Sequence, residues 1–227
     1  LKGKKQIFLP DMASLIQKDI PVFFPEYAPI HQPYQIYFTS GTTGKPKCVQ
    51  HTFKTVYLHH THICEESRFD SNDIWGHIAP MFRLVDAFSI YSITSVGGKH
   101  VFVESFQPKQ TIDIIKMEKI TCTNMASTQL EMCIDYLVSD INNVHLRLLS
   151  CGGSALSSNT LHKMIRNTNI EFFVSYGMTE CCGKISMSMI EHFHKNKHSQ
   201  VHLINSSGKS FSGISLKVIN SENKKVN

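Results

Sequence analysis

Apolar and polar residues alternate along residues 34–39, a segment rich in residues that favour strands, so a β-strand is predicted there. A loop rich in Gly, Thr and Pro follows at residues 40–46. Apolar residues then recur at helical spacing between Phe53 and Cys64, which predicts a helix over roughly residues 51–66.

The same succession of strand and helix signals continues along most of the chain. Further strands are predicted at residues 99–103, 120–124, 147–151, 171–175 and 214–219. Further helices are predicted to begin at Pro108, at a capping box formed by Thr128 and Glu131, and at residue 158. Repeated strand–loop–helix units predict an α/β fold in which helices flank a mostly parallel sheet.

Three loops leave the carboxyl ends of predicted strands, at residues 40–47, 152–155 and 176–180. Ligands of parallel α/β sheets bind at such loops, so these segments are the candidate binding site. A long loop-like stretch begins at residue 196. We therefore expect an α/β core over residues 1–195 and the start of a β-barrel-like subdomain over residues 196–227.

The composition is that of a globular protein. The chain has 227 residues, of which 41% are hydrophobic and 18% charged, enough for one large domain or two small ones. Its net charge of +5 comes from scattered lysines and arginines, so no basic stripe for nucleic acid is predicted. The longest weakly polar stretch, residues 84–98, is too short and too polar to span a bilayer.

The seven cysteines show no spacing of a disulfide framework and are odd in number. Free thiols in a reducing compartment are the simplest interpretation, and we expect a cytoplasmic protein.

The run TSGTTGKPK at residues 39–47 carries the strongest chemical signal. Its two glycines allow close approach of the backbone to a ligand, and its hydroxyl groups, backbone N–H groups and lysines suit a polyphosphate. The run is not a Walker A loop, because only Thr42 and Thr43 separate Gly41 from Gly44 and a proline follows the first lysine. The alternative is a plain hydrophilic turn.

This run resembles the phosphate-binding signature of the adenylate-forming superfamily, which includes acyl- and aryl-CoA synthetases, firefly luciferase and adenylation domains of peptide synthetases. Cys48 stands where the family usually has glycine. The resemblance implies that the nucleotide is bound by Thr39, Ser40, Gly41, Thr42, Thr43, Gly44, Lys45 and Lys47. It also assigns Lys47 a catalytic role at the phosphates.

A second run, YGMTE at residues 176–180, resembles another motif of the family. The resemblance implies that Tyr176 stacks on adenine, Thr179 contacts the α-phosphate and Glu180 holds Mg²⁺. An aromatic face suits a purine, and a carboxylate beside a phosphate makes sense mainly with a divalent cation between them. An ordinary strand–turn–helix junction is the alternative. The implied nucleotide site further includes Gly177 and Met178, together with Gly152, Gly153 and Ser154 of the run CGGSA.

A third run, APMFR at residues 79–83, resembles the segment that the family writes Pro-Met-Phe-His. Arg83 replaces the usual histidine and could pair with a carboxylate through two hydrogen bonds. The alternative is an exposed arginine after a strand. Position beside the motifs makes Phe82, Val85, Met125 and Ala126 further candidates for the acyl pocket, although core roles would explain them equally. A minor alternative has Asp86 binding a substrate ammonium group.

A weaker resemblance lies at residues 207–219, where the family passes into its β-barrel portion. The motifs occur in family order over residues 34–219. The resemblance implies that the chain is the central part of a longer enzyme and lacks the family's ribose-binding aspartate and the small domain with the catalytic lysine.

The implied function is an ATP-dependent, Mg²⁺-dependent acid–thiol ligase that uses CoA. It would join a small carboxylic acid to CoA through an acyl-adenylate. The alternatives are an adenylation module that loads a carrier protein and a non-catalytic nucleotide-binding remnant.

Two dense histidine clusters raise the question of zinc. One comprises His59, His60 and His62, and the other lies at residues 191–198. Neighbouring positions on a helix point in different directions and the spacings fit no zinc pattern, so no zinc site is predicted.

Overall fold

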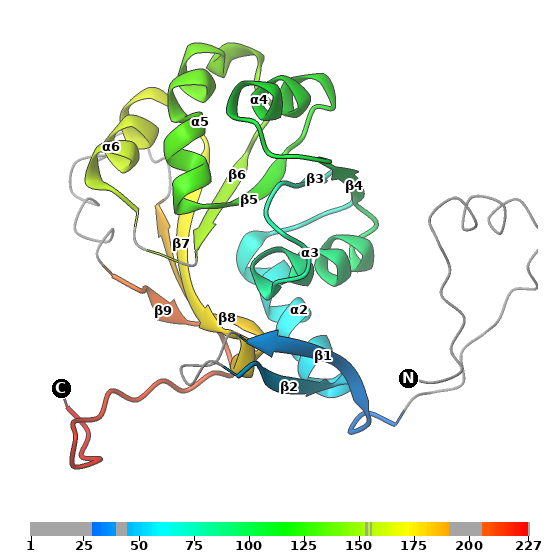
Figure 1. The fold of residues 1–227 in the computed structure, drawn as a ribbon, viewed down its shortest axis with the longest axis vertical. Coiled ribbons are helices and arrows are strands. Elements are labelled where there is room, and N and C mark those ends of the chain that lie inside the picture. Colours follow the sequence, from blue (N-terminus) through cyan, green and yellow to red (C-terminus); the bar gives the residue numbers. More distant parts are fainter. Residues whose placement is uncertain (1–28, 40–44, 153, 155, 191–205, 227) are drawn as a thin grey trace, which may run out of the picture.

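The computed structural model describes residues 29–39, 45–152, 154, 156–190 and 206–226. These residues form a seven-stranded sheet with strand order β4-β3-β5-β6-β7-β8-β9 and a separate hairpin, β1-β2 (Figure 1). The strands are β1 (Pro33–Thr39), β2 (Lys47–Thr52), β3 (Ile74–His77), β4 (Lys99–Phe102), β5 (Cys122–Ala126), β6 (Leu148–Gly152), β7 (Glu171–Met178), β8 (Gly183–Ile190) and β9 (Lys209–Ser210). The helices are α2 (Phe53–Ser67), α3 (Leu84–Ser95), α4 (Pro108–Met117), α5 (Ser127–Ser139) and α6 (Ser158–Asn167), with 3₁₀ turns η1 (Ile141–Asn143) and η2 (Thr179–Cys181).

The main sheet is mostly parallel, as the sequence predicts. Strands β4, β3, β5, β6 and β7 run parallel to one another. Strand β8 returns antiparallel along β7, and β9 continues antiparallel along β8. The parallel part therefore ends at β7, where the chain reverses through η2 instead of crossing over with a helix.

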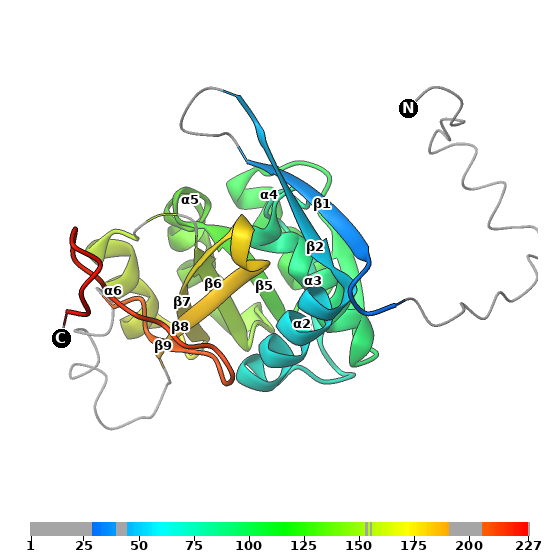
Figure 2. The ribbon, with the colours of Figure 1, turned by 90° about the horizontal axis from the view of Figure 1, so that it is seen from below.

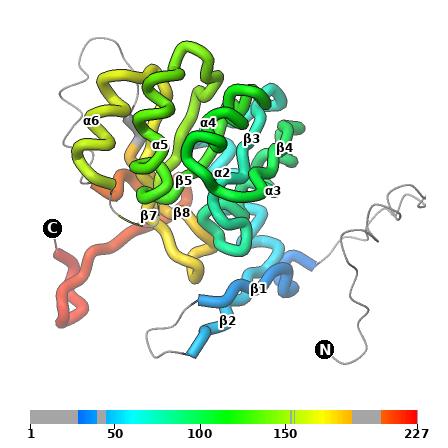
Figure 3. The backbone as a smooth tube through the Cα atoms, turned by 45° about the horizontal axis from the view of Figure 1, so that its top comes forward, coloured from blue at the N-terminus to red at the C-terminus, as the bar shows by residue number. Residues whose placement is uncertain are grey.

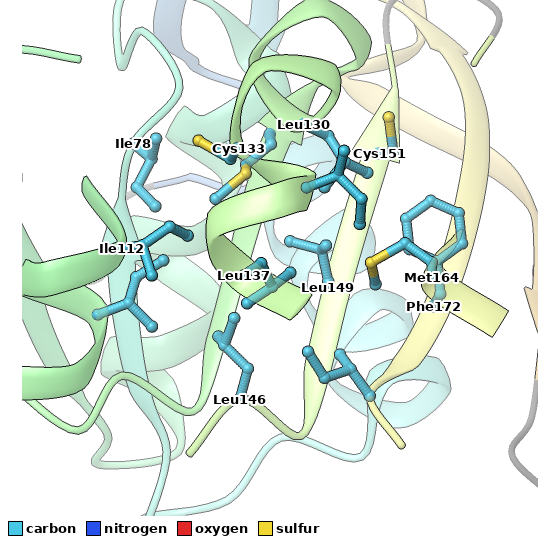
Figure 4. Packing of buried hydrophobic residues seen from close by; sticks show 14 of the residues in the cluster. Ile78, Ile112, Leu130, Cys133, Leu137, Leu146, Leu149, Cys151, Met164 and Phe172 are labelled. Atoms are coloured by element: carbon cyan, nitrogen blue, oxygen red, sulfur yellow. The ribbon is translucent and has the colours of Figure 1, made fainter. Parts of the chain in front are cut away.

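Helices cover both faces of the parallel strands (Figures 1 and 3). Successive residues of a strand point to opposite faces, so Leu149 packs toward α4, α5 and α6 while Leu148 packs toward α2 and α3. Figure 4 shows the first of these cores, in which Leu130, Leu137 and other helix residues meet the strands. The parallel strands are therefore covered by an apolar core on each face.

The hairpin β1-β2 lies against α2 and α3, outside the main sheet (Figures 2 and 3). The Tyr34 ring meets the edge of Phe53 at 5.4 Å between centroids and lies 5.8 Å from Tyr91 of α3. A two-stranded hairpin is marginally stable alone, so these aromatic contacts fix its position.

The boundaries of several helices differ from those predicted. The helix predicted at residues 51–66 begins at Phe53, because the preceding residues form β2 and the Thr52 side chain caps the helix by accepting from the Thr55 N–H at 3.2 Å. The capping box at Thr128 was wrong. The N-cap of helix α5 is Ala126, two residues earlier, and Gln129 Oε1 accepts from the Ala126 N–H at 3.0 Å.

The strand predicted at residues 214–219 is also wrong, since that segment has only an isolated bridge between Ile219 and Lys225. Sequence patterns missed β2, β3, α3, β8 and β9. The division of the chain at residue 196 stays a prediction, although β9 joins the main sheet.

All seven cysteines are free thiols, as predicted. Cys48 and Cys181 are exposed, whereas the others are buried or half-buried. Within the part of the chain that the structure describes, no helix is long and apolar enough to cross a bilayer.

An ion pair between the half-buried Arg147 and the buried Asp73 ties the start of β3 to the start of β6. Arg147 donates from Nε to Asp73 Oδ1 at 2.8 Å and from Nη2 to Asp73 Oδ2 at 2.5 Å. Burial alone would raise the pKa of Asp73, but the hydrogen bonds from Arg147 and from the backbone N–H of Asp70 hold that pKa below its ordinary value. The pair therefore keeps a buried carboxylate charged at the amino-terminal edge of the sheet.

Removing the arginine leaves this buried carboxylate unpaired. We expect Arg147→Met to lower the free energy of unfolding by about 3 kcal/mol, measured by urea denaturation. The matched control is Arg166→Met, at an exposed position in the last turn of α6, which should change stability by less than about 0.5 kcal/mol. Equal effects of the two changes would contradict the role given to Arg147.

Candidate functional site

A cavity of about 500 Å³ opens at the carboxyl ends of β6 and β7. It is bounded by the hairpin β1-β2, the start of α3 and the reversal from β7 into β8. The residues that line it are Tyr37, Phe38, Thr39, Pro46, Phe82, Arg83, Leu84, Val85, Gly152, Ser175, Gly177, Met178, Thr179, Gly183 and Lys184. This is the position at which a parallel α/β sheet is expected to hold its ligand.

The cavity brings together residues of the three numbered motifs and of the run CGGSA. Those that line it are Thr39 of the first run, Gly152, Gly177, Met178 and Thr179 of the second and third loops, and Phe82, Arg83 and Val85 of the proposed acyl pocket. Residues 40–44 and Gly153 lie outside the described residues, so the placement of Ser40, Gly41, Thr42, Thr43 and Gly44 stays a prediction.

Two candidates for the acyl pocket lie elsewhere. The Met125 side chain is fully buried in the core beneath α4, α5 and α6, on the face of the sheet opposite α3. Ala126 is the residue before α5 and does not line the cavity. Alternation along β5 explains the position of Met125, because only every second side chain of a strand faces a given side.

Several other predicted residues are exposed beside the cavity without lining it: Lys45, Lys47, Ser154, Tyr176 and Glu180. Thr39 and Lys47 are paired across the hairpin, and Thr39 and Pro46 line the cavity. The loop between the two strands therefore starts and finishes at the cavity.

A buried histidine attaches the hairpin to the second motif. His51 of β2 is buried, and its Nε2 lies 2.7 Å from the carbonyl oxygen of Thr179. Because a carbonyl can only accept, Nε2 carries the proton and donates it. Gln35 of β1 adds contacts to the Tyr91 hydroxyl at 3.2 Å and to Cys182 Sγ at 3.8 Å. These contacts hold the first and second motifs at one site.

The reversal from β7 into β8 is very tight. A Cβ built on Gly177 would lie 1.9 Å from the carbonyl oxygen of Gly183 and 2.7 Å from the Cα of Lys184. Cys182 adopts the left-handed conformation, with φ of 65°. The turn thus places Thr179 at the cavity and sends the next side chain of β8, Lys184, into the interior.

Lys184 is the most unusual charged residue of the cavity. Only 5% of it is exposed, and its Nζ donates to Ser150 Oγ at 2.7 Å. The same Nζ lies 4.1 Å from the centroid of the Phe88 ring and 4.6 Å from that of Phe173. Burial lowers the pKa of Lys184 to about 7, although the nearby Asp86 charge acts in the opposite direction. Near pH 7, the side chain of Lys184 is therefore divided between its charged ammonium form and its neutral amine form.

Asp86 is fully buried and both carboxylate oxygens already have partners. Trp75 Nε1 donates to Oδ1 at 3.1 Å, and His77 Nδ1 lies 2.7 Å from Oδ2. On the other side of the His77 ring, Nε2 is hydrogen-bonded to His100 Nδ1 at 2.8 Å. Asp86 does not line the cavity, so these contacts argue against its binding a substrate ammonium group.

The residues of the second motif fit a divalent cation. Glu180 is exposed and has no salt bridge to any residue that the structure describes. Its carboxylate and the neighbouring Thr179 hydroxyl are oxygen donors of the kind Mg²⁺ prefers. The described histidines form no group of three metal-binding residues with other described side chains. His59 is buried instead, and burial lowers its pKa to about 4.

Sequence reasoning missed His51 and Lys184. No local pattern identifies His51, because its partner Thr179 is 128 positions away. Lys184 directly follows the tight turn of the second motif. The one sequence signal for its burial was a lysine within a run of apolar and small residues.

Comparison with known proteins places this geometry in context. The family model described as "AMP-binding enzyme" matches residues 9–227. A 2-succinylbenzoate–CoA ligase of Staphylococcus aureus (strain MSSA476) is 30% identical over 159 residues, which are 70% of this chain and 32% of that protein. The chain thus spans about a third of the length of the curated relatives it matches.

Solved structures share the fold. The inhibitor-bound N-terminal domain of FACL13 from Mycobacterium tuberculosis superimposes with a TM-score of 0.82 at 17% identity, covering 96% of this chain and 53% of that one. O-succinylbenzoate coenzyme A synthetase from Bacillus subtilis, in complex with ATP and magnesium ion, gives 0.77 at 22% identity, covering 95% and 43%. These likenesses confirm the expected α/β architecture of adenylate-forming enzymes.

The tight turn gives a first stability prediction for the site. We expect Gly177→Ala to lower the free energy of unfolding by about 3 kcal/mol or more, because the new methyl group meets backbone atoms that cannot rotate away. In the matched change Gly152→Ala, the methyl group would meet Ser175 Oγ at 3.0 Å, and that side chain can rotate. Urea denaturation should show a loss several times smaller for Gly152→Ala. Equal losses would show that the turn has room to relax.

Lys184 gives a pH-dependent prediction. The pKa of this lysine is about 10.5 in an ordinary environment and about 7 in the fold, so between these values the unfolded chain binds one more proton. The cost of burying Lys184 is therefore complete below pH 7 and shrinks as the pH rises toward 10.5.

We expect Lys184→Met to unfold at a higher temperature than the wild type at pH 7, with a difference that decreases by pH 9.5. Taking the difference between the two proteins cancels the titration of the shared groups that do not interact with Lys184, which leaves Lys184 and its neighbours Cys151 and His59. A constant difference between pH 7 and 9.5 would show that Lys184 keeps an ordinary pKa.

Proposed function

Since the chain belongs to the AMP-binding enzyme family, we propose that it provides the nucleotide and acid site of an ATP-dependent acid–thiol ligase. The observation that supports this most strongly is the single cavity shared by three motifs. Thr39 and Pro46 at the ends of the phosphate-loop hairpin, Thr179 of the second motif and Arg83 all line it. ATP and a carboxylic acid can thus bind side by side in one site.

In the proposed reaction, a carboxylate oxygen of the acid attacks the α-phosphorus of ATP. The bond from that phosphorus to the oxygen bridging to the β-phosphate breaks, which gives an acyl-adenylate and pyrophosphate. The loop at residues 40–44 and Lys47 would bind the β- and γ-phosphates and stabilise the negative charge of the leaving pyrophosphate. Thr179 would contact the α-phosphate from the opposite side of the cavity.

Glu180 would hold Mg²⁺, whose positive charge stabilises the phosphate groups during the reaction. Tyr176 is 46% exposed, which leaves its ring free to stack on adenine. Gly152, Gly153, Ser154, Gly177 and Met178 would form the rest of the nucleotide site. The exposed side chain of Phe82 and the half-buried Val85 would contact the acyl group.

A thiol would then attack the acyl carbon and release AMP. We propose CoA as this thiol, in a cytoplasmic enzyme, because the curated relatives are named as CoA ligases. A carrier-protein phosphopantetheine is the alternative acceptor. Arg83, at the start of α3, would hold the carboxylate of the acid through its guanidinium group.

Exchange of pyrophosphate into ATP tests the proposal directly. We expect the full-length protein to exchange labelled pyrophosphate into ATP with at least one acid from a panel of fatty, aromatic and amino acids that includes 2-succinylbenzoate. Lys47→Ala and Glu180→Ala should each lower the rate by about 100-fold or more, because each removes charge stabilisation at the phosphates.

The control changes are Lys54→Ala and Glu118→Ala, at exposed positions on α2 and after α4. They should leave the rate within about threefold of the wild type. Absence of exchange with every acid would favour a nucleotide-binding remnant, and unchanged rates in the Lys47 and Glu180 variants would refute their roles.

A further inference from the structure

Resting on the proposed function, we infer that Lys184 selects acids that carry a second anionic group, with the dicarboxylates as the substrate class. The carboxylate to be activated would lie near Arg83 and Thr179. The second carboxylate would lie deeper in the cavity and accept hydrogen bonds from Lys184.

The first argument is the lack of an anionic partner for Lys184. Among the residues that the structure describes, no carboxylate lies within ion-pair distance of its Nζ. The nearby Asp86 accepts from Trp75 and His77 with its two oxygens. Burying a cation without a paired anion costs free energy. An anionic ligand that reaches Lys184 would therefore gain a favourable electrostatic interaction.

The second argument is an excess of hydrogen-bond donors around the ammonium group. Ser150 accepts from Lys184 and donates its own hydroxyl proton to Asn124 Oδ1. Asn124 Oδ1 also lies 3.5 Å from Nζ. The Nδ2 of Asn124, on a fully buried side chain, has no partner among the described residues. Asn124 and Lys184 together thus offer N–H donors without acceptors, which is the arrangement that a carboxylate satisfies.

The third argument is position. Lys184 lines the cavity together with Arg83, so two cationic side chains border the same space of about 500 Å³. The two belong to different elements, β8 and the start of α3. The rings of Phe88 and Phe173 lie beside the ammonium group, with their centroids 4.1 and 4.6 Å from Nζ. A molecule with an acidic group at each end matches these two charges, whereas a simple fatty acid would leave Lys184 unpaired.

The test compares acids of equal chain length with one or two carboxylates, for example octanoate against octanedioate and benzoate against benzene-1,4-dicarboxylate. Pyrophosphate exchange by the full-length protein gives kcat/KM for each acid. We expect the wild type to prefer at least one diacid over its monoacid partner. In Lys184→Met this preference ratio should fall by about 100-fold, the size expected for losing a buried charge-assisted interaction.

Lys163→Met is the matched control, because Lys163 lies on α6, on the other face of the sheet, and pairs with Asp135 at 2.6 Å. It should leave the preference ratio unchanged. Lys184→Gln, which keeps a donor but loses the charge, should give an intermediate ratio, and it replaces the Met variant if that protein does not fold.

The outcomes separate the two proposals. A wild type that exchanges with monoacids and shows no preference for any diacid, or a ratio that Lys184→Met and Lys184→Gln leave unchanged, overturns this inference while the ligase function stands. Absence of exchange with all acids overturns the ligase function, and the inference with it. A preference for a diacid that is lost in Lys184→Met and reduced in Lys184→Gln supports both proposals.

Discussion

The contact between Gly177 and Gly183 is the constraint on which the site depends. Strands β7 and β8 approach so closely there that a single methyl group would collide with the backbone. Because of this contact the chain reverses within a few residues, and Thr179 stays at the cavity while β8 runs back along β7. The same reversal turns Lys184 inward, so one steric requirement positions both a nucleotide-binding candidate and the buried cation.

His51 extends this arrangement to the hairpin. A hairpin that is not part of the main sheet has few ways to hold a fixed position, and here one imidazole connects β2 to the backbone of Thr179. His51 donates its hydrogen bond to a backbone carbonyl of the protein, not to a ligand. The loop at residues 40–44 therefore begins and ends on strands whose position is set by the second motif.

The sequence predicted those parts of the fold whose signals are local. Helix α6 begins at the predicted residue because Ser157 caps it and its apolar residues repeat at helical spacing. Strand β8 was missed although Ile185 and Met187 alternate with polar residues, and both sets of side chains are buried in the fold. Met125 takes the core role that the sequence left open beside the acyl-pocket role, because position beside a motif does not reveal which face of the sheet a side chain takes. The sequence did not reveal that Asp86 accepts hydrogen bonds from Trp75 and His77, because these contacts form only when β3 packs against α3.

The distribution of thiols offers a practical means of observing the site. Burial raises the pKa of Cys64 and Cys151, raises that of Cys133 to about 12 and raises that of Cys182 to about 11, so these thiols are poor nucleophiles at neutral pH. Cys48 and Cys181 are exposed, and they directly follow Lys47 and Glu180 in the chain. An alkylating fluorophore would therefore label the protein at two natural positions, one beside each motif. Energy transfer between dyes at these positions would report the separation of the hairpin from the β7–β8 turn in solution.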